Sequence, residues 1–331
     1  MRGAMNWRSS LVVCLVVGLS AVACRGKSWR PPLKALVAPW VGNSALYAAQ
    51  SHKRFAPLDL RVIVLSTDFD GWRAIIEHRA DMFAGTVFDA LRAVDGGADL
   101  RIVTALDFST GADGVIAREG ISDLAALKGK RVAVERCTTT HFVLLRALDR
   151  AGIHEEDVSL ENYATDAALK ALDEGRVDAA ALWEPYLSKA KKPGRKVLFT
   201  SAEIPGEVID VLGVRADLVR DRPADIANIV RGIHTEADLF RTDRDYAITT
   251  LMAENEITKD VAQESFASVH FVTADENRAL FDRANTGASL WKTYELAAEF
   301  LNKHKMLRHP PRPPEEILAA GAKLPAAASK P

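Results

Sequence analysis

A run of small apolar residues, bounded by a turn and by a polar loop, most constrains what this chain can form. It lies in RVDAAALWEPY, residues 176–186, directly after Asp173-Glu174-Gly175. The run is too short for a helix and predicts a short buried strand of a parallel sheet. Residues 79–86, RADMFAGT, repeat the pattern with Arg, Asp and one Ala in register. The repeat predicts two sheets that face one another across a ligand.

Trp183 and Glu184 follow the run at its carboxyl end. Ligands of open α/β sheets bind beyond the carboxyl ends of the strands, so we expect both side chains in a binding cleft. A tryptophan that caps the strand beside a solvated glutamate is the alternative interpretation.

Short strands alternate with single helices along most of the chain, which predicts βαβ units and an α/β fold with mostly parallel sheets flanked by helices. The predicted strands are residues 33–38, 60–65, 81–84, 100–106, 114–118, 131–135, 158–162, 177–182, 196–200 and 207–214. The segment DFSTGAD at 107–113 is predicted to be a loop that interrupts this pattern. From residue 217 onward the pattern is helical, with predicted helices at 223–240, 244–255, 259–267, 275–284 and 287–304.

Residues 1–23 have the composition of a signal peptide. Arg2 and Arg8 precede an uncharged run from Leu11 to Ala23, which is too short to span a bilayer and has the length of a signal-peptide core. The run ends in Ala-Val-Ala-Cys, which resembles the lipobox of bacterial lipoproteins. We therefore predict lipid attachment at Cys24 and a location in the periplasm or on the outer face of a bacterial membrane. Cleavage without lipid attachment and an uncleaved anchor helix are the alternatives.

Charge and cysteine content exclude several classes of protein. The chain has 43 basic and 44 acidic residues, without the basic excess that a nucleic-acid partner requires. Cys14 lies in the signal and Cys24 at the lipid site, so Cys137 is one remaining thiol without an internal disulfide. No Cys/His spacing fits a metal site, and the G-x-x-x-x-G-K-[ST] motif of ATPases is missing. Glu135 and His141 form at most an acid–base pair without a nucleophile or oxyanion hole, so we expect neither an enzyme nor a cofactor.

Five segments carry a resemblance that spans roughly residues 33–305. They are VAPWVGNSALYAAQ (37–50), LDFSTGADGVIAR (106–118), ISDLAALKGKRVAVE (121–135), EGRVDAAALWEPYLSKA (174–190) and EVIDVLGVRADLVRDRP (207–223). In this order they resemble the periplasmic substrate-binding proteins of the nitrate/sulfonate/taurine (NMT1/THI5-like) group of ABC importers. The pair LKGKRVAVE and GRVDAAALWEP is fairly specific to that group.

The resemblance implies a two-lobed periplasmic-binding-protein fold of type II, whose chain crosses twice between the lobes. It places residues 30–112 and 213–310 in lobe 1 and residues 113–212 in lobe 2, with a linker at 24–32 and a tail at 311–331. It also implies a monomer that delivers a small polar organic ligand, of sulfonate or taurine type, to a membrane permease driven by a separate ATPase. An exported sensor and a relative of the thiamine-pyrimidine enzymes are the alternatives. The enzyme alternative would need clustered cysteines, which this sequence lacks.

The expected binding site combines donors and acids. Helix starts near residues 40–44 and 137–140 supply N–H groups and hydroxyls for an anion, or they are ordinary helix caps. An amine would bind to acids, which are Asp107 or Asp113 in the crossing loop, Glu184, and Asp210 in the return strand. For Asp210, a salt bridge of the hinge is the alternative. Together they favour a zwitterion or an amine-bearing acid of taurine size. The predicted ligand-binding residues are Trp40, Asn43, Ser44, Thr86, Asp107, Ser109, Thr138, Thr139, Trp183, Glu184 and Asp210.

Overall fold

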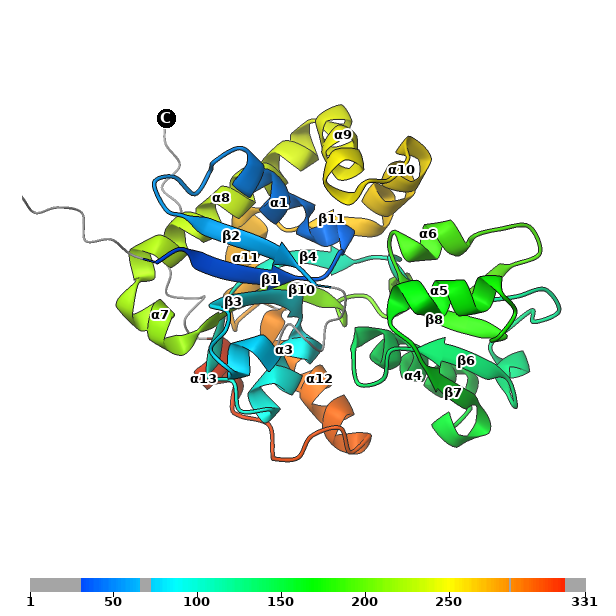
Figure 1. The fold of residues 1–331 in the computed structure, drawn as a ribbon. Helices are drawn as coiled ribbons and strands as arrows, with labels where there is room; N and C mark the ends of the chain where they lie inside the picture. Colours follow the sequence, from blue (N-terminus) through cyan, green and yellow to red (C-terminus); the bar gives the residue numbers. More distant parts are fainter. Residues whose placement is uncertain (1–30, 66–72, 286, 319–331) are drawn as a thin grey trace, which may run out of the picture. The chain divides into compact units, whose positions relative to one another are not determined.

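The computed structural model describes residues 31–65, 73–285 and 287–318. The described residues from Leu33 to Leu318 belong to one compact unit. Figure 1 shows that this unit contains two sheets with helices packed against both. The α/β class predicted from the sequence is thereby confirmed.

The first sheet has six strands in the order β11-β4-β10-β3-β1-β2. They are β1 (Leu33–Val37), β2 (Leu60–Val64), β3 (Met82–Thr86), β4 (Leu100–Ser109), β10 (Ile209–Arg215) and β11 (Val269–Phe271). β1 pairs in parallel with β2 and β3, whereas β10 runs antiparallel to both β3 and β4, and β11 antiparallel to β4.

The second sheet has five strands in the order β7-β6-β8-β5-β9. They are β5 (Asp113–Ala117), β6 (Arg131–Val134), β7 (Ser159–Asn162), β8 (Ala179–Trp183) and β9 (Lys196–Thr200). β6 is parallel to β7 and β8, but β5 is antiparallel to β8 and β9. Both sheets are thus mixed rather than mostly parallel, because the strands next to each crossing run against their neighbours.

The chain changes sheets in two short segments. It leaves the first sheet between Ser109 and Asp113 and returns between Thr200 and Ile209. The predicted loop at 107–113 is therefore wrong in its first part, because Asp107 to Ser109 continue β4. The predicted lobe boundary at 212/213 falls inside β10, a strand of the first sheet.

Helices cover both faces of each sheet (Figure 1). The helices of eight residues or more are α1 (Ser44–Ser51), α3 (Val87–Asp95), α4 (Thr139–Ala151), α5 (Thr165–Asp173), α8 (Pro223–Thr242), α9 (Arg244–Asn255), α10 (Lys259–Ser268), α11 (Ala274–Phe281) and α12 (Leu290–Lys303). The shorter ones include η1 (Val41–Asn43), α6 (Tyr186–Ala190), α7 (Ala216–Asp221) and α13 (Pro314–Leu318). The predicted strand at 177–182 overlaps β8, and the predicted helix at 244–255 agrees with α9.

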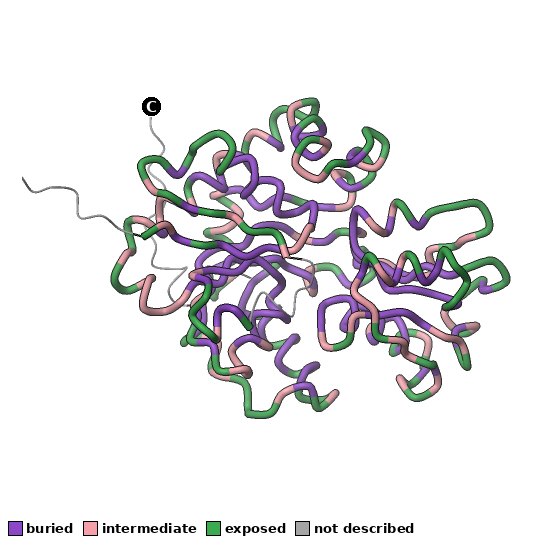
Figure 2. Tube along the Cα trace, viewed as in Figure 1, coloured by how far each residue is buried: buried purple, intermediate pink, exposed green. Residues whose placement is uncertain are grey.

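Alternate residues of the buried strands pack on opposite faces, because strand side chains alternate with a period of two. In β8, Ala179 and Ala181 join the apolar cluster of α4, while Ala180 and Leu182 join the cluster of α5 and α6. Figure 2 shows that these central strands are buried throughout. An apolar run without alternation, as the sequence has at β8, is the pattern that two covered faces require.

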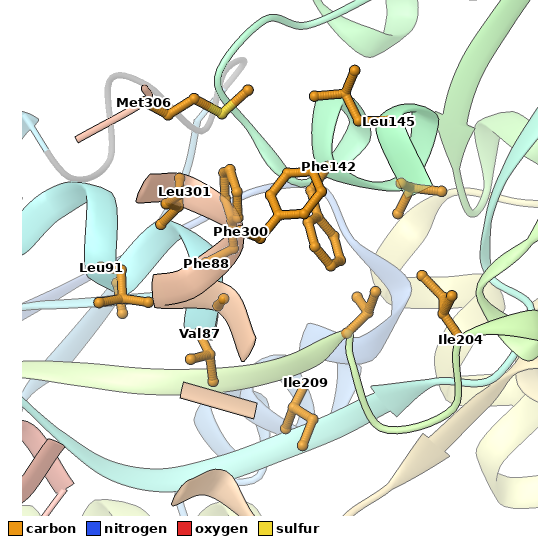
Figure 3. Close-up of a cluster of buried hydrophobic side chains, with 14 of the residues drawn as sticks. Val87, Phe88, Leu91, Phe142, Leu145, Ile204, Ile209, Phe300, Leu301 and Met306 are labelled. Carbon is orange, nitrogen blue, oxygen red and sulfur yellow. The ribbon is translucent and has the colours of Figure 1, made fainter. Parts of the chain in front are cut away.

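One cluster of aromatic side chains connects helices that cover different sheets. Phe142 of α4 lies 5.5 Å from Phe88 of α3 and 4.7 Å from Phe300 of α12, measured between ring centroids. Figure 3 shows the three rings together, with Leu301 and Met306 beside them. The contact fixes the start of α4, which carries Thr139, relative to the start of α3.

The signal peptide, Cys24 and most of the predicted linker and tail lie outside the described residues. Within the described ranges, no helix combines the length and the apolar composition that a membrane crossing needs.

Candidate functional site

A cavity of 30 Å³ lies where the two sheets meet, at the ends of β1, β3, β5, β8 and β10. Residues from both sheets line it. They are Ala38, Trp40, Asn43, Ala84, Gly85, Thr86, Asp89, Asp113, Thr139, Trp183 and Asp210. The cavity is small, and most of its lining residues carry polar side chains.

A row of polar side chains crosses the first sheet at this cavity. Asp210 of β10 pairs with Thr86 on one side and with Asp107 on the other. Paired residues of neighbouring strands point to the same face of a sheet, so the three lie side by side. The side chains of Asp107 and Asp210 are hydrogen-bonded to each other, which requires a proton on one of the two carboxyl groups.

Trp40 forms one wall of the cavity and is held by Asp107. Its indole Nε1 donates to the Asp107 carboxyl group, 3.3 Å from each oxygen. The short helix η1 follows directly, and Gly42 within it lies against this pair. A Cβ at Gly42 would collide with both the Asp107 carboxylate and the indole nitrogen of Trp40, which explains why glycine occupies the position.

The second sheet contributes a cross-strand pair. Asp113 of β5 lies opposite Trp183 of β8, and both line the cavity. The Trp183 ring meets Trp40 edge to face, with centroids 6.1 Å apart and planes at 82°. Tyr186 supports Trp183 from behind at 4.9 Å. The two tryptophans, one shortly after β1 and one at the end of β8, therefore contact each other at the cavity.

Asp89 links the two halves of the site. Its Oδ2 accepts hydrogen bonds from Thr86 N (3.1 Å), Thr86 Oγ1 (2.7 Å) and Thr139 Oγ1 (2.9 Å). Thr86 and Asp89 form a capping box at the start of α3, and Thr139 opens α4. The hydroxyls of Thr86 and Thr139 also lie 2.7 Å apart. This cluster joins a helix start of the first sheet to one of the second.

Burial dominates the electrostatics of the site. It raises the pKa of Asp107 to about 8, with repulsion from Asp113 adding to the effect. It raises the pKa of Asp113 to about 7, with contributions from the charges of Asp89 and Glu184. Burial also raises the pKa of Asp89. Such shifts mark carboxyl groups crowded together away from water.

Six predicted ligand-binding residues line the cavity, and a seventh contacts the lining. The six are Trp40, Asn43, Thr86, Thr139, Trp183 and Asp210, and Asp107 lies directly behind Trp40.

The other four predicted residues are buried nearby and hydrogen-bonded within the protein. Ser44 accepts from Asn255, and Thr138 donates to the carbonyl of Glu135. Ser109 pairs with Ser201, which connects the two crossing segments. Glu184 accepts from the backbone and hydroxyl of Ser188 and from Ser265 of α10. None of the four is part of the cavity lining.

The sequence-based list of ligand-binding residues missed Asp89 and Asp113. Asp89 has a recognisable signal, since Thr86-x-x-Asp89 before an apolar helix is the pattern of a capping box. Asp113 was counted with the crossing loop but is the first residue of β5. Its position opposite Trp183 depends on strand register, which the sequence alone does not specify.

A larger groove of 820 Å³ lies beside β11 and the start of α12. Its lining is largely apolar and includes Phe108, Phe266 and Leu296. It lacks the convergence of buried polar groups from both sheets that marks the smaller cavity. Within the described part of the chain, no group of three or more His, Cys, Asp or Glu residues is arranged to hold a metal ion.

Comparison with known proteins gives a consistent result. The sequence profile of the NMT1-like family matches residues 37–250. A putative binding protein of Brucella abortus (strain 2308) is 29% identical over 151 residues, 44% of this chain and 46% of the relative. The taurine-binding periplasmic protein of Escherichia coli is 32% identical over 115 residues, 34% of this chain and 35% of the relative. These matches span less than half the length of either relative, and both relatives are binding proteins rather than enzymes.

A solved structure shares the fold. The alkanesulfonate-binding protein SsuA from Xanthomonas axonopodis pv. citri, bound to MOPS, superimposes with a TM-score of 0.72 at 19% identity. The superposition covers 89% of this chain and 99% of that protein. The predicted two-lobed periplasmic-binding-protein fold is thereby confirmed.

Proposed function

The chain belongs to the NMT1-like family, and on that basis we propose that it is the solute-binding protein of an ABC importer. It captures a small polar organic ligand between its two lobes and delivers the ligand to a membrane permease driven by an ATPase. The observation that carries the proposal is the cavity whose walls come from both sheets, with Trp40 and Thr86 on one side and Thr139 and Trp183 on the other. Two relatives are named as a taurine-binding protein and a putative aliphatic sulfonates-binding protein, which supports a role in binding small organic ligands.

The proposed mechanism is hinge closure without chemistry. A cavity of 30 Å³ has room for about two water molecules, so it must widen before an organic ligand can enter. The proposed hinges are the two crossing segments, residues 110–112 and 201–208. The residues between them form one lobe, and the residues before the first and after the second form the other. Contacts drawn from both lobes favour the closed state because only there are both sets satisfied.

This mechanism predicts a change of size on binding. A thermal-shift screen of sulfonates, amines and vitamin precursors should identify a ligand, because binding to the native state raises the unfolding midpoint by mass action. Small-angle scattering should then show a smaller radius of gyration with the ligand than without it. An unchanged radius at saturation, or conversion of the ligand into a product, would contradict the proposed receptor.

We further propose that the protein acts as a monomer in the periplasm or on the outer face of the membrane, anchored by lipid at Cys24. Replacing Cys24 with serine should move the protein from the membrane fraction to the soluble fraction, because the thiol is the site of lipid attachment. Fractionation of cells followed by detection of the full chain measures the change. A wild-type protein that is already soluble would show that the anchor does not exist.

A further inference from the structure

The lining of the cavity is acidic. It contains the carboxyl groups of Asp89, Asp113 and Asp210, and the carboxyl group of Asp107 is hydrogen-bonded directly behind it. Among the lining residues, all of which belong to the described ranges, there is no lysine, arginine or histidine. A buried anion such as a sulfonate is stable only when it is paired or well supplied with donors, and this lining offers it no cationic partner.

Four lining residues, Trp40, Asn43, Thr86 and Thr139, already direct side-chain donors to protein oxygens, whereas the indole N–H of Trp183 does not. Asn43 Nδ2 donates to the carbonyl of Ala38 at 3.0 Å, and Trp40 Nε1 donates to Asp107. The hydroxyls of Thr86 and Thr139 both contact Asp89 Oδ2. An incoming acceptor would have to displace these bonds or accept from the Trp183 indole alone.

Two acceptors of the lining, in contrast, have no hydrogen-bond partner. They are Asp89 Oδ1 and Asn43 Oδ1, and each residue is only 2% exposed. The bond from Asn43 Nδ2 to Ala38 settles the orientation of the amide, so the unpartnered atom is the oxygen. An unpartnered buried acceptor costs free energy unless water or a ligand donates to it. A ligand group that reaches these two atoms must therefore bring N–H or O–H groups.

We propose that the site binds an organic cation through a protonated nitrogen, which donates to Asp89 Oδ1 and Asn43 Oδ1 beside Asp113. Amines and amidines are the fitting class of ligand. Trp40 and Trp183 supply aromatic faces and edges near the same point, and aromatic rings favour a desolvated cation. The inference rests on the proposed function and specifies its ligand: the recognised group is the nitrogen cation, and a sulfonate group is not required.

Matched probes test the recognised group on the full chain. Acetamidine and ethylamine should raise the unfolding midpoint at millimolar concentration, whereas acetamide and ethanesulfonate should not. Acetamide has nearly the shape of acetamidine without the charge, so the pair isolates the charge. Zinc and calcium salts serve as controls for a metal ion.

Two variants test the residues. Asp89→Asn on α3 and Asp113→Asn on β5 should each weaken acetamidine binding about tenfold or more, because each removes a charge that a buried cation needs. Asp178→Asn is the matched control, since Asp178 is also buried but forms ion pairs with Arg118 and Arg131 at the opposite end of β8. It should leave the affinity unchanged. If Asp89→Asn does not fold, Asp113→Asn provides the same test from the other sheet.

The outcomes separate this inference from the proposed function. Binding of ethanesulfonate, tightened by the aspartate-to-asparagine changes, would overturn the cation site and leave a solute-binding protein. A midpoint shift with zinc or calcium alone would overturn it in favour of a metal site. If no organic compound of any charge binds, the cation site and the proposed function both fall.

Discussion

Replacing Phe142 with alanine should lower the free energy of unfolding by about 3–5 kcal/mol, the usual cost of truncating a buried phenylalanine. The ring is 3% exposed and contacts both Phe88 and Phe300. The helices around Phe142 pack against different sheets. They therefore cannot fill the cavity left by the missing ring without shifting against one another. Urea unfolding followed by circular dichroism measures the loss.

The same substitution should weaken ligand binding, because Phe142 lies one turn after Thr139 on α4. Thr139 reaches Asp89 only if the start of α4 keeps its position against α3. Leu296→Ala on α12 is the control: Leu296 is a large apolar residue but 49% exposed, and its loss should change stability by less than about 0.5 kcal/mol. Equal effects of the two changes would show that the aromatic cluster does not connect the two halves.

The arrangement of strands and helices was largely predictable because it depends on local patterns. β8 is an apolar run covered on both faces, and α9 begins at Asp243, whose side chain accepts from the backbone of Tyr246. β11 was missed because three residues are too few for any periodicity. β4 was predicted too short because Asp107 and Ser109 are polar, and their hydrogen-bond partners lie in distant parts of the chain.

The candidate site was predictable in part. Trp183 could be placed from its position at the end of an apolar run, and Trp40 from the loop after the first strand. The acidic character of the cavity could not be predicted, because Asp89, Asp113 and Asp210 lie on three separate segments. Only strand register and the capping of α3 bring them together. The sequence suggested a balance of donors and acids, whereas the lining of the cavity has an excess of acids.

We expect a second large effect from the crowded acids: the free energy of unfolding should fall as the pH rises from 6.5 to 8. In the folded protein the pKa of Asp107 is about 8 and that of Asp113 about 7, while both are near 3.9 in the unfolded chain. Across this range the folded state holds protons that the unfolded state has released, so the free energy of unfolding falls with pH. If Asp107 retains one proton over these 1.5 pH units, the free energy of unfolding falls by about 2 kcal/mol. Asp113 loses its proton earlier in the range and therefore adds a smaller decrease.

The groups around the two aspartates do not cancel this slope. Asp107 faces Trp40 and the acids Asp210 and Asp113, and Asp113 faces Ser109, Asp89 and Glu184, so its charged neighbours are all acidic. Burial lowers the pKa of His141 to about 4, which affects stability mainly below its unfolded pKa of about 6.5.

Urea unfolding at pH 6.5 and pH 8 should therefore show the decline in wild type and much less of it in Asp107→Asn. Asp178→Asn should keep the full decline, because ion pairs lower the pKa of Asp178 and leave it ionised in both states at these pH values. A bound cation favours the ionised aspartates, so saturating acetamidine should flatten the wild-type slope and bind more tightly at pH 8 than at pH 6.5. A wild-type stability that is constant across the range would show that Asp107 and Asp113 are ionised in the folded protein. An affinity that falls as the pH rises would contradict binding of a cation between these carboxyl groups.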